Sequence, residues 1–198
     1  MQARRRLLRG ALAAAAALLA GCATLVPAVD RPSDAARVRG GGTADVVQRQ
    51  PAPGSCHARG SGRFTLPDPR CTPGAVSPAV SQANIHATIC RAGYTRRVRP
   101  PAWVTQREKR ASMAAYGDSG SPRRYEYDHL IPLELGGAAN DPHNLWPEPG
   151  ASPNPKDALE DSLRARVCEH RVGLAVAQSE LARNWVAVYR RTLAARSG

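Results

Sequence analysis

The sequence predicts a small α+β domain that is mostly helical and stapled by disulfides. Residues 125–130 alternate in the manner of a strand, and residues 144–146 are expected to form a second, shorter strand. Apolar residues recur at helical spacing over residues 155–168 and 181–189, which predicts two amphipathic helices. Four cysteines follow Cys22, and an even number of cysteines in an exported chain indicates disulfides.

The first 21 residues have the features of an export signal. Arginines precede the apolar run of residues 11–20, which is too short for a comfortable membrane span. The letters LAGC, ending at Cys22, resemble a bacterial lipoprotein box, so we expect residues 1–21 to be removed and Cys22 to carry the lipid. An ordinary signal cleaved nearby is the alternative. Ala23 lacks the acidic signal for inner-membrane retention, which favours the outer membrane of a two-membrane cell.

The chain is strongly basic. It has 28 Lys+Arg against 16 Asp+Glu, and removing the four arginines of residues 1–21 lowers the formal charge from +12 to +8. A basic balance favours polyanionic partners, either nucleic acid or an anionic membrane surface.

Residues 22–75 are expected to be a flexible tether. The segment is rich in Gly, Pro, Ala and Arg and shows no sustained period of a helix or a strand. Such a composition buries too little apolar surface to order itself. The folded domain is therefore predicted to span residues 76–198.

The cysteines allow three pairings. We favour Cys56–Cys71 as a local closure and Cys90–Cys168 as a long-range link, although spacing alone does not decide between the pairings. A zinc site made by Cys56, His57, His86 and Cys90 is the competing interpretation. It is disfavoured because no Cys-x-x-Cys occurs and an oxidising compartment disfavours free thiolates.

Local signals place the remaining elements. Ser81 is a candidate N-cap for a short helix, whereas residues 94–103 are expected to be extended because they contain Pro100-Pro101. Residues 105–108 fit a capping box that opens a helix to about Tyr116, with Gly117 as its left-handed terminator.

Prolines and a capping residue also mark the end of the second strand and the start of the next helix. Pro147 and Pro149 are expected to stop the second strand, and Asn154-Pro155 are an N-cap and first residue for the helix that follows.

Polar residues fall at the ends of these elements. Asp128 and His129 end the first strand, Asn144 begins the second, and Asn154 begins the helix. Hydrolysis of a phosphodiester needs a base for the attacking water, for which an imidazole is suited, and a cation beside the phosphoryl oxygens. A carboxylate and an amide carbonyl are oxygen ligands suited to a hard divalent ion.

The phrase YEYDHLIPLELGG…NDPHNLWPEP…NPKDALED resembles the HNH endonuclease family, whose site is a ββα-metal finger. The resemblance spans residues 125–163 within a core finger of residues 123–170. It implies that Asp128 and Asn154 hold one divalent ion, Mg²⁺ or Mn²⁺, that His129 is the general base, and that Asn144 orients this base. The final position is not His, no Cys-x-x-Cys pair is present, and Asn154 could instead be a plain N-cap.

Basic residues lie just before and within this stretch. Those expected to contact nucleic acid are Arg99, Lys109, Arg110, Arg123, Arg124 and Lys156, and phosphate contacts of this kind carry little sequence preference. A solvated basic face is the alternative for each arginine. Lys156 could instead pair with Glu160 four residues later.

The sequence thus predicts an exported, membrane-tethered, metal-dependent HNH-type endonuclease that acts on nucleic acid, DNA in preference to RNA. The alternative is an envelope lipoprotein, or a nucleic-acid-binding protein, that retains the finger without turnover. A hydrolase of another kind ranks last, because neither a nucleophile elbow nor a zinc-binding histidine triad is recognisable.

Overall fold

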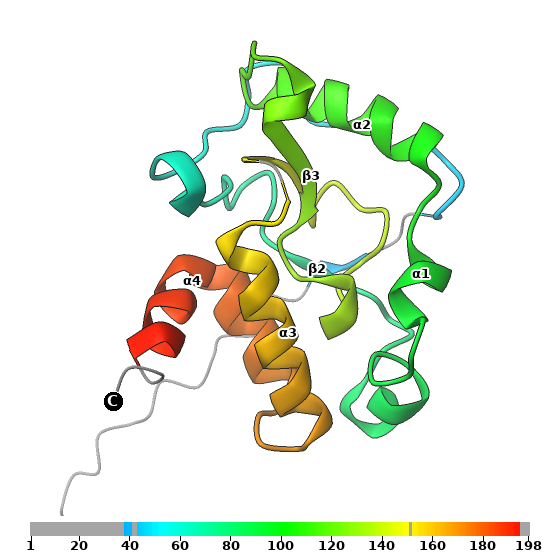
Figure 1. The fold of residues 1–198 in the computed structure, drawn as a ribbon. Coiled ribbons are helices and arrows are strands. Elements are labelled where there is room, and N and C mark those ends of the chain that lie inside the picture. Colours follow the sequence, from blue (N-terminus) through cyan, green and yellow to red (C-terminus); the bar gives the residue numbers. More distant parts are fainter. Residues whose placement is uncertain (1–37, 41–42, 151, 195–198) are drawn as a thin grey trace, which may run out of the picture. The chain divides into compact units, whose positions relative to one another are not determined.

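The protein is a small α+β domain held by two disulfides (Figure 1). A computed structural model describes residues 38–40, 43–150 and 152–194, so the expected signal peptide and Cys22 lie outside the described residues. Its helices are α1 (Tyr94–Val98), α2 (Ala102–Ala115), α3 (Pro155–Cys168) and α4 (Leu174–Ala194). Its strands are β1 (Val38–Arg39), β2 (Ala75–Val76), β3 (Tyr125–His129) and β4 (Leu145–Pro149). Four short 3₁₀ helices, η2 (Gly62–Phe64), η3 (Gln82–Ala87), η4 (Pro122–Arg124) and η5 (Leu133–Leu135), connect them.

Strands β3 and β4 form the antiparallel hairpin that carries the predicted site. Asp128 lies opposite Trp146, and His129 lies opposite Leu145. The second strand continues through Pro147, which pairs with Tyr127, and ends at Pro149, the second of the two prolines expected to stop it. Proline is tolerated on a strand whose second edge has no ladder partner, and among the described residues this sheet has two strands.

Helices α3 and α4 supply much of the core. The predicted apolar stripe of α3, Leu159, Leu163 and Val167, is buried against Leu181 and Trp185 of α4. Figure 1 shows α3 and α4 side by side, with α2 lying across the opposite end of the hairpin. Burying such side chains contributes about 2 kcal/mol each, so this pairing anchors the helix that follows the hairpin.

The segment before α2 differs from the sequence prediction. Residues Tyr94–Val98 form a helix, and the two prolines end it instead of keeping the whole segment extended. Helix α2 begins at Ala102, three residues before the predicted N-cap. Glu108 is not a capping residue: it is 1% exposed and accepts a 2.7 Å hydrogen bond from the Gln48 backbone. The predicted end of α2 is confirmed, with Gly117 at a φ of 73°.

Residues 43–75, expected to be part of the tether, are packed on the domain. The Cys56 backbone donates to Ala115 at 3.0 Å, and the Thr72 hydroxyl lies 2.8 Å from the Tyr116 hydroxyl. The Trp185 indole donates to the Thr65 carbonyl at 3.2 Å. These contacts join residues far apart in sequence, which local composition and periodicity do not report. The domain therefore begins well before residue 76.

Both favoured disulfides are present. Cys56 bonds to Cys71 and Cys90 bonds to Cys168, with Cα–Cα distances of 5.9 and 5.7 Å. These bonds remove both thiols of the alternative zinc site. Disulfides indicate an oxidising environment. Within the described part of the chain, no helix has the length and apolar character needed to cross a membrane.

Candidate functional site

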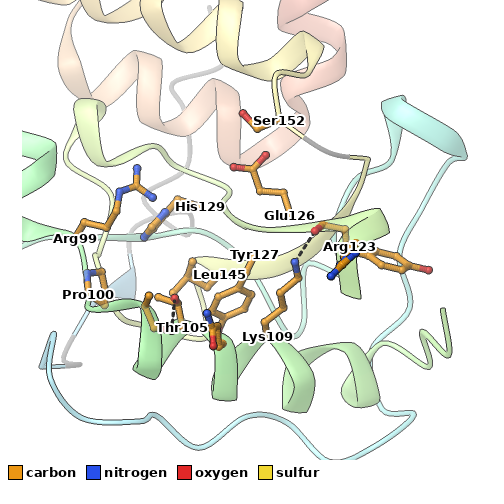
Figure 2. A pocket seen from close by; sticks show the side chains of 13 residues that line it. Arg99, Pro100, Thr105, Lys109, Arg123, Glu126, Tyr127, His129, Leu145 and Ser152 are labelled. Atoms are coloured by element: carbon orange, nitrogen blue, oxygen red, sulfur yellow. Dashed lines mark hydrogen bonds between the residues drawn. The ribbon is translucent and has the colours of Figure 1, made fainter. Parts of the chain in front are cut away.

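His129 lies at the end of β3, where it is 6% exposed and lines a pocket (Figure 2). Its Nε2 lies 2.9 Å from the Ala139 carbonyl oxygen. A carbonyl only accepts hydrogen bonds, so Nε2 carries the proton and Nδ1 keeps its lone pair. Burial lowers the pKa of His129 to about 4, which keeps the ring neutral at physiological pH. The strand thus presents an imidazole of fixed tautomer.

Asn144 holds the loop that supplies this carbonyl. Its Oδ1 accepts from the Ile131 N–H at 2.9 Å, and its Nδ2 donates to the carbonyls of Ile131 and Ala138 at 2.9 and 3.0 Å. The side chain is fully buried. Asn144 therefore orients His129 indirectly, by fixing the residue next to Ala139, and no hydrogen bond joins the Asn144 side chain to the imidazole.

The close approach of backbone in this loop depends on Gly137. A Cβ at this position would lie 1.8 Å from the Ile131 carbonyl oxygen and 2.7 Å from Asn144 Nδ2. Only glycine fits where two chain segments meet this tightly. Gly137 thus has a role in the site, because it lets Asn144 reach both sides of the loop.

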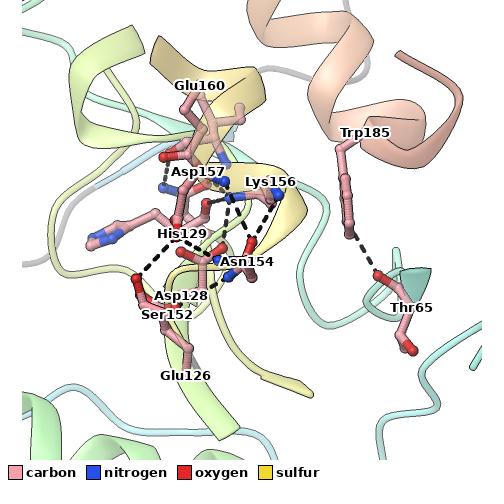
Figure 3. A network of polar contacts seen from close by, with 12 residues as sticks. Thr65, Glu126, Asp128, His129, Ser152, Asn154, Lys156, Asp157, Glu160 and Trp185 are labelled. Atoms are coloured by element: carbon pink, nitrogen blue, oxygen red, sulfur yellow. Dashed lines mark hydrogen bonds and ion pairs between the residues drawn. The ribbon is translucent and has the colours of Figure 1, made fainter. Parts of the chain in front are cut away.

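Asp128 belongs to a buried polar network around Lys156 (Figure 3). The Lys156 ammonium donates to Asp128 Oδ2 at 2.6 Å and to the His129 carbonyl at 2.8 Å, and it also contacts Glu160 Oε1. Lys156 is 1% exposed. This burial does not favour the predicted contact of Lys156 with nucleic acid, and the structure has the alternative pairing with Glu160.

The charges of this network depend on one another. Burial opposes ionisation of Asp128, but the Lys156 ammonium outweighs it and lowers the Asp128 pKa. Burial would also lower the pKa of Lys156, yet attraction to Asp128, Glu160 and Glu148 raises it. Burial and then repulsion from Asp128 raise the pKa of Glu148 to about 10, so Glu148 is protonated at neutral pH. The network therefore keeps one buried cation beside an ionised Asp128.

Asn154 is the N-cap of α3. Its Oδ1 accepts from the backbone N–H groups of Lys156 and Asp157 at 2.8 and 3.4 Å, and Asp157 Oδ2 accepts from the Asn154 N–H at 2.8 Å. The amide nitrogen of Asn154 faces Glu126 at 3.2 Å. The oxygen that would bind a metal thus already satisfies the start of the helix.

The predicted ligand pair consequently does not fit a divalent ion as arranged. Asp128 Oδ2 holds an ammonium, and Asn154 Oδ1 holds two N–H groups. Across the described residues, no group of three or more His, Cys, Asp or Glu side chains is placed to bind a metal. The divalent ion remains a prediction that these two oxygens do not support.

The pocket beside His129 has a volume of about 620 Å³. Three residues expected to bind nucleic acid line it, with Arg99 near His129 at one end and Lys109 and Arg123 at the other (Figure 2). Lys109 donates to the Tyr125 carbonyl at 2.6 Å, which leaves two of its N–H groups for other partners. The walls therefore combine an imidazole with three cationic side chains and one acid, Glu126.

A smaller hollow of about 190 Å³ also includes His129 and Arg99. It differs in charge, because its other ionisable residues are Glu126, Asp128, Glu134, Asp157 and Glu160. Burial and then repulsion from Asp128 and Asp157 raise the pKa of Glu126 to about 7. His129 therefore lines both hollows, of which the larger is mainly basic and the smaller mainly acidic.

The remaining basic residues lie farther from His129. Arg110 shares a shallow hollow with Lys109 and Arg123, and exposed Arg124 lines none of these three hollows. Sequence reasoning missed Trp103, which is 52% exposed at the start of α2 with the Arg107 guanidinium 5.8 Å from its ring centre. It also missed the Ala139 carbonyl, for which the sequence carries no signal because any residue supplies one.

No protein-family model, curated protein or solved structure matches this chain. The interpretation of the site therefore rests on its geometry and on the resemblance carried by residues 125–163.

Proposed function

We propose that this chain is an HNH-type endonuclease that hydrolyses phosphodiester bonds of DNA with little sequence specificity. The observation that carries the proposal is the neutral His129 imidazole, whose tautomer is fixed by Ala139, in a pocket lined by Arg99, Lys109 and Arg123. The order of β3, β4 and α3, with Asp128-His129 at the strand end, supports the ββα-finger assignment. Export to an envelope membrane through a lipid on Cys22 completes the proposal, and the two disulfides are consistent with export.

In this proposal, water attacks the phosphorus and gives its proton to His129 Nδ1. The bond between phosphorus and the 3′ oxygen breaks, and that oxygen takes up a proton, leaving a 3′-hydroxyl and a 5′-phosphate. The arginines and Lys109 offset the charge of the phosphoryl oxygens. Burial makes His129 a weak base in the free protein, and a bound phosphate would raise its pKa because a nearby anion favours the imidazolium.

Exposed residues of α2 extend this basic surface. Trp103 and Arg107 lie one helical turn apart, and Arg110 follows on the same side of the helix. An exposed indole beside guanidinium groups is suited to stacking on an unpaired base while the cations contact phosphates. This surface supports nucleic acid as the polyanion that binds the pocket.

Plasmid nicking tests the proposal. Full-length protein purified in detergent is incubated with supercoiled DNA in Mg²⁺, in Mn²⁺ and in EDTA. We expect nicking by the wild type and a loss of about 100-fold or more in His129→Ala, the usual size of a general-base effect. His143→Ala, which changes a histidine with a half-exposed side chain, is the matched control and should retain activity. Equal nicking by the wild type and His129→Ala, or no nicking in any condition, would contradict the enzyme assignment.

A nucleic-acid-binding envelope protein without turnover is the second candidate. It is favoured by one observation, namely that Asp128 and Asn154 are both engaged by internal partners. In that case the wild type and His129→Ala would bind DNA equally and neither would nick it. Binding measured alongside nicking therefore separates the two functions.

A further inference from the structure

We infer that the Lys156 ammonium takes the place beside Asp128 that the HNH resemblance assigns to a divalent ion. The finger would then be built around an internal cation, and Asp128 and Lys156 would position His129 without binding a metal. The inference concerns the cation at the proposed nuclease site, but its metal-binding test does not depend on nuclease activity.

The contacts of Lys156 account for the whole ammonium group. An ammonium has three N–H donors, and three oxygens surround this one: Asp128 Oδ2, the His129 carbonyl and Glu160 Oε1. Two of these oxygens come from β3 and the third comes from α3. Lys156 thus binds the strand end to the helix, as a shared metal ion would bind two elements of a finger.

The charges around Lys156 resemble those of a cation site. The carboxyl groups of Asp128, Glu160 and Glu148 all act on this ammonium. The ionised Asp128 is 9% exposed, so water screens its charge weakly. A divalent ion at Asp128 would meet the ammonium at close range and would have to displace it. Without Lys156, the same place would contain only oxygen donors, which Mg²⁺ and Mn²⁺ prefer.

The contact with the His129 carbonyl gives Lys156 a positioning role. This carbonyl belongs to the residue whose side chain lines the pocket, so the lysine fixes the backbone from which the imidazole projects. The imidazole itself is held by Ala139 on its other side. Lys156 and Ala139 therefore restrain His129 at its backbone and at its ring.

The test compares Mn²⁺ binding by full-length wild type, Lys156→Ala and Lys156→Met. Bound Mn²⁺ is counted by electron paramagnetic resonance, and the melting temperature Tm is recorded with Mn²⁺ and with EDTA. For the wild type we expect no Mn²⁺ bound through Asp128 and a Tm that changes by less than about 1 °C between the two conditions. Lys156→Ala should melt lower, bind one Mn²⁺ and regain about 5 °C when Mn²⁺ is added.

Two further variants and Lys156→Met control this result. Adding Asp128→Asn to Lys156→Ala should abolish the gained Mn²⁺ site, because it removes the central carboxylate. Asp161→Asn changes an exposed acid on α3 and should leave Mn²⁺ binding as in the parent protein. Lys156→Met fills the space of the lysine stem without its charge, so it should lose stability without gaining the site that the smaller Ala opens.

Two results would overturn the inference. One is stoichiometric Mn²⁺ binding by the wild type that is lost in Asp128→Asn, a measurement that holds even if no Lys156 variant folds. The other is Lys156→Ala or Lys156→Met with wild-type Tm, because the ammonium would then have no structural role.

Nicking in Mg²⁺ and in EDTA separates failure of this inference from failure of the proposed function. Nicking that requires Mg²⁺, together with Mn²⁺ binding through Asp128, would sink the inference and leave the endonuclease intact. A wild type that neither binds Mn²⁺ at Asp128 nor nicks DNA in any condition would contradict the endonuclease and leave the inference about Lys156 intact.

Discussion

The buried amide of Asn144 offers the sharpest test of how the site is held. Replacing it with Ala removes three hydrogen bonds and leaves the Ile131 N–H, the Ile131 carbonyl and the Ala138 carbonyl without that partner. A buried polar group left unsatisfied costs about 1–3 kcal/mol. Allowing for partial relaxation, we expect Asn144→Ala to lose about 3–5 kcal/mol, a large part of the stability of a domain.

The same substitution should reach His129. Ala138 directly precedes Ala139, whose carbonyl fixes the imidazole tautomer. Loss of the hydrogen bond to the Ala138 carbonyl should therefore also make the position of the Ala139 carbonyl less fixed. Under the proposed function, nicking by the folded fraction of Asn144→Ala should fall by about 10-fold or more, because the base would lose its fixed orientation. A variant with reduced stability and unchanged nicking would show that the loop does not position His129.

Urea unfolding at pH 7 with the disulfides intact measures the loss. Asn144→Asp keeps the oxygen that accepts from Ile131 but replaces the donor facing two carbonyls, so it should also be strongly destabilised. His143→Ala changes the adjacent residue, whose side chain is half exposed, and should cost about 1 kcal/mol or less. A loss of less than about 1 kcal/mol in Asn144→Ala would refute the argument from unsatisfied groups.

Three further predictions concern other parts of the molecule. The pKa of His129 is about 4 in the folded protein and 6.5 in the unfolded chain, so the unfolded chain binds the proton more tightly and stability falls as the pH falls. Between pH 7 and 4.5, the free energy of unfolding of the wild type should therefore fall by about 2 kcal/mol more than that of His129→Gln, as measured by urea titration. Single-stranded oligonucleotides should quench the emission of Trp103, the exposed tryptophan, and Trp103→Phe should remove that change. Replacing Cys90 and Cys168 together with Ala should cost about 4 kcal/mol in urea unfolding, because their bond closes a long loop.

The hairpin and the start of α3 could be predicted because their signals are local. Alternation marks residues 125–129 as a strand, and Asn154-Pro155 mark the helix start whatever lies elsewhere in the chain. The passage of β4 through Pro147 could not be predicted, because the proline rule assumes a strand with partners on both edges. That condition is a property of the finished sheet, and the sequence of β4 does not contain it.

The error over residues 43–75 has a different cause. Composition indicates how much apolar surface a segment can bury by itself, and the composition of residues 43–75 indicates little. It is ordered by the disulfide Cys56–Cys71 and by hydrogen bonds such as the one between Trp185 and Thr65, which are 120 residues apart. The predicted Cys56–Cys71 disulfide itself argues against a fully flexible tether, because a closed loop loses much of the chain entropy that disorder requires.

The register of α3 also predicts that Lys156 is buried. With Asn154 as N-cap, Lys156 lies three residues before Leu159 and seven before Leu163, on the face that the apolar stripe buries. A lysine at the N-terminal end of a buried stripe, on its buried face, must meet acidic partners, because an unpaired buried ammonium is too costly. Glu160 is on the same face by its spacing of four, and Asp128 completes the pairing from β3. The signals that predict the helix therefore also argue against a phosphate contact for Lys156, and they direct its charge toward the carboxylate expected to hold the metal.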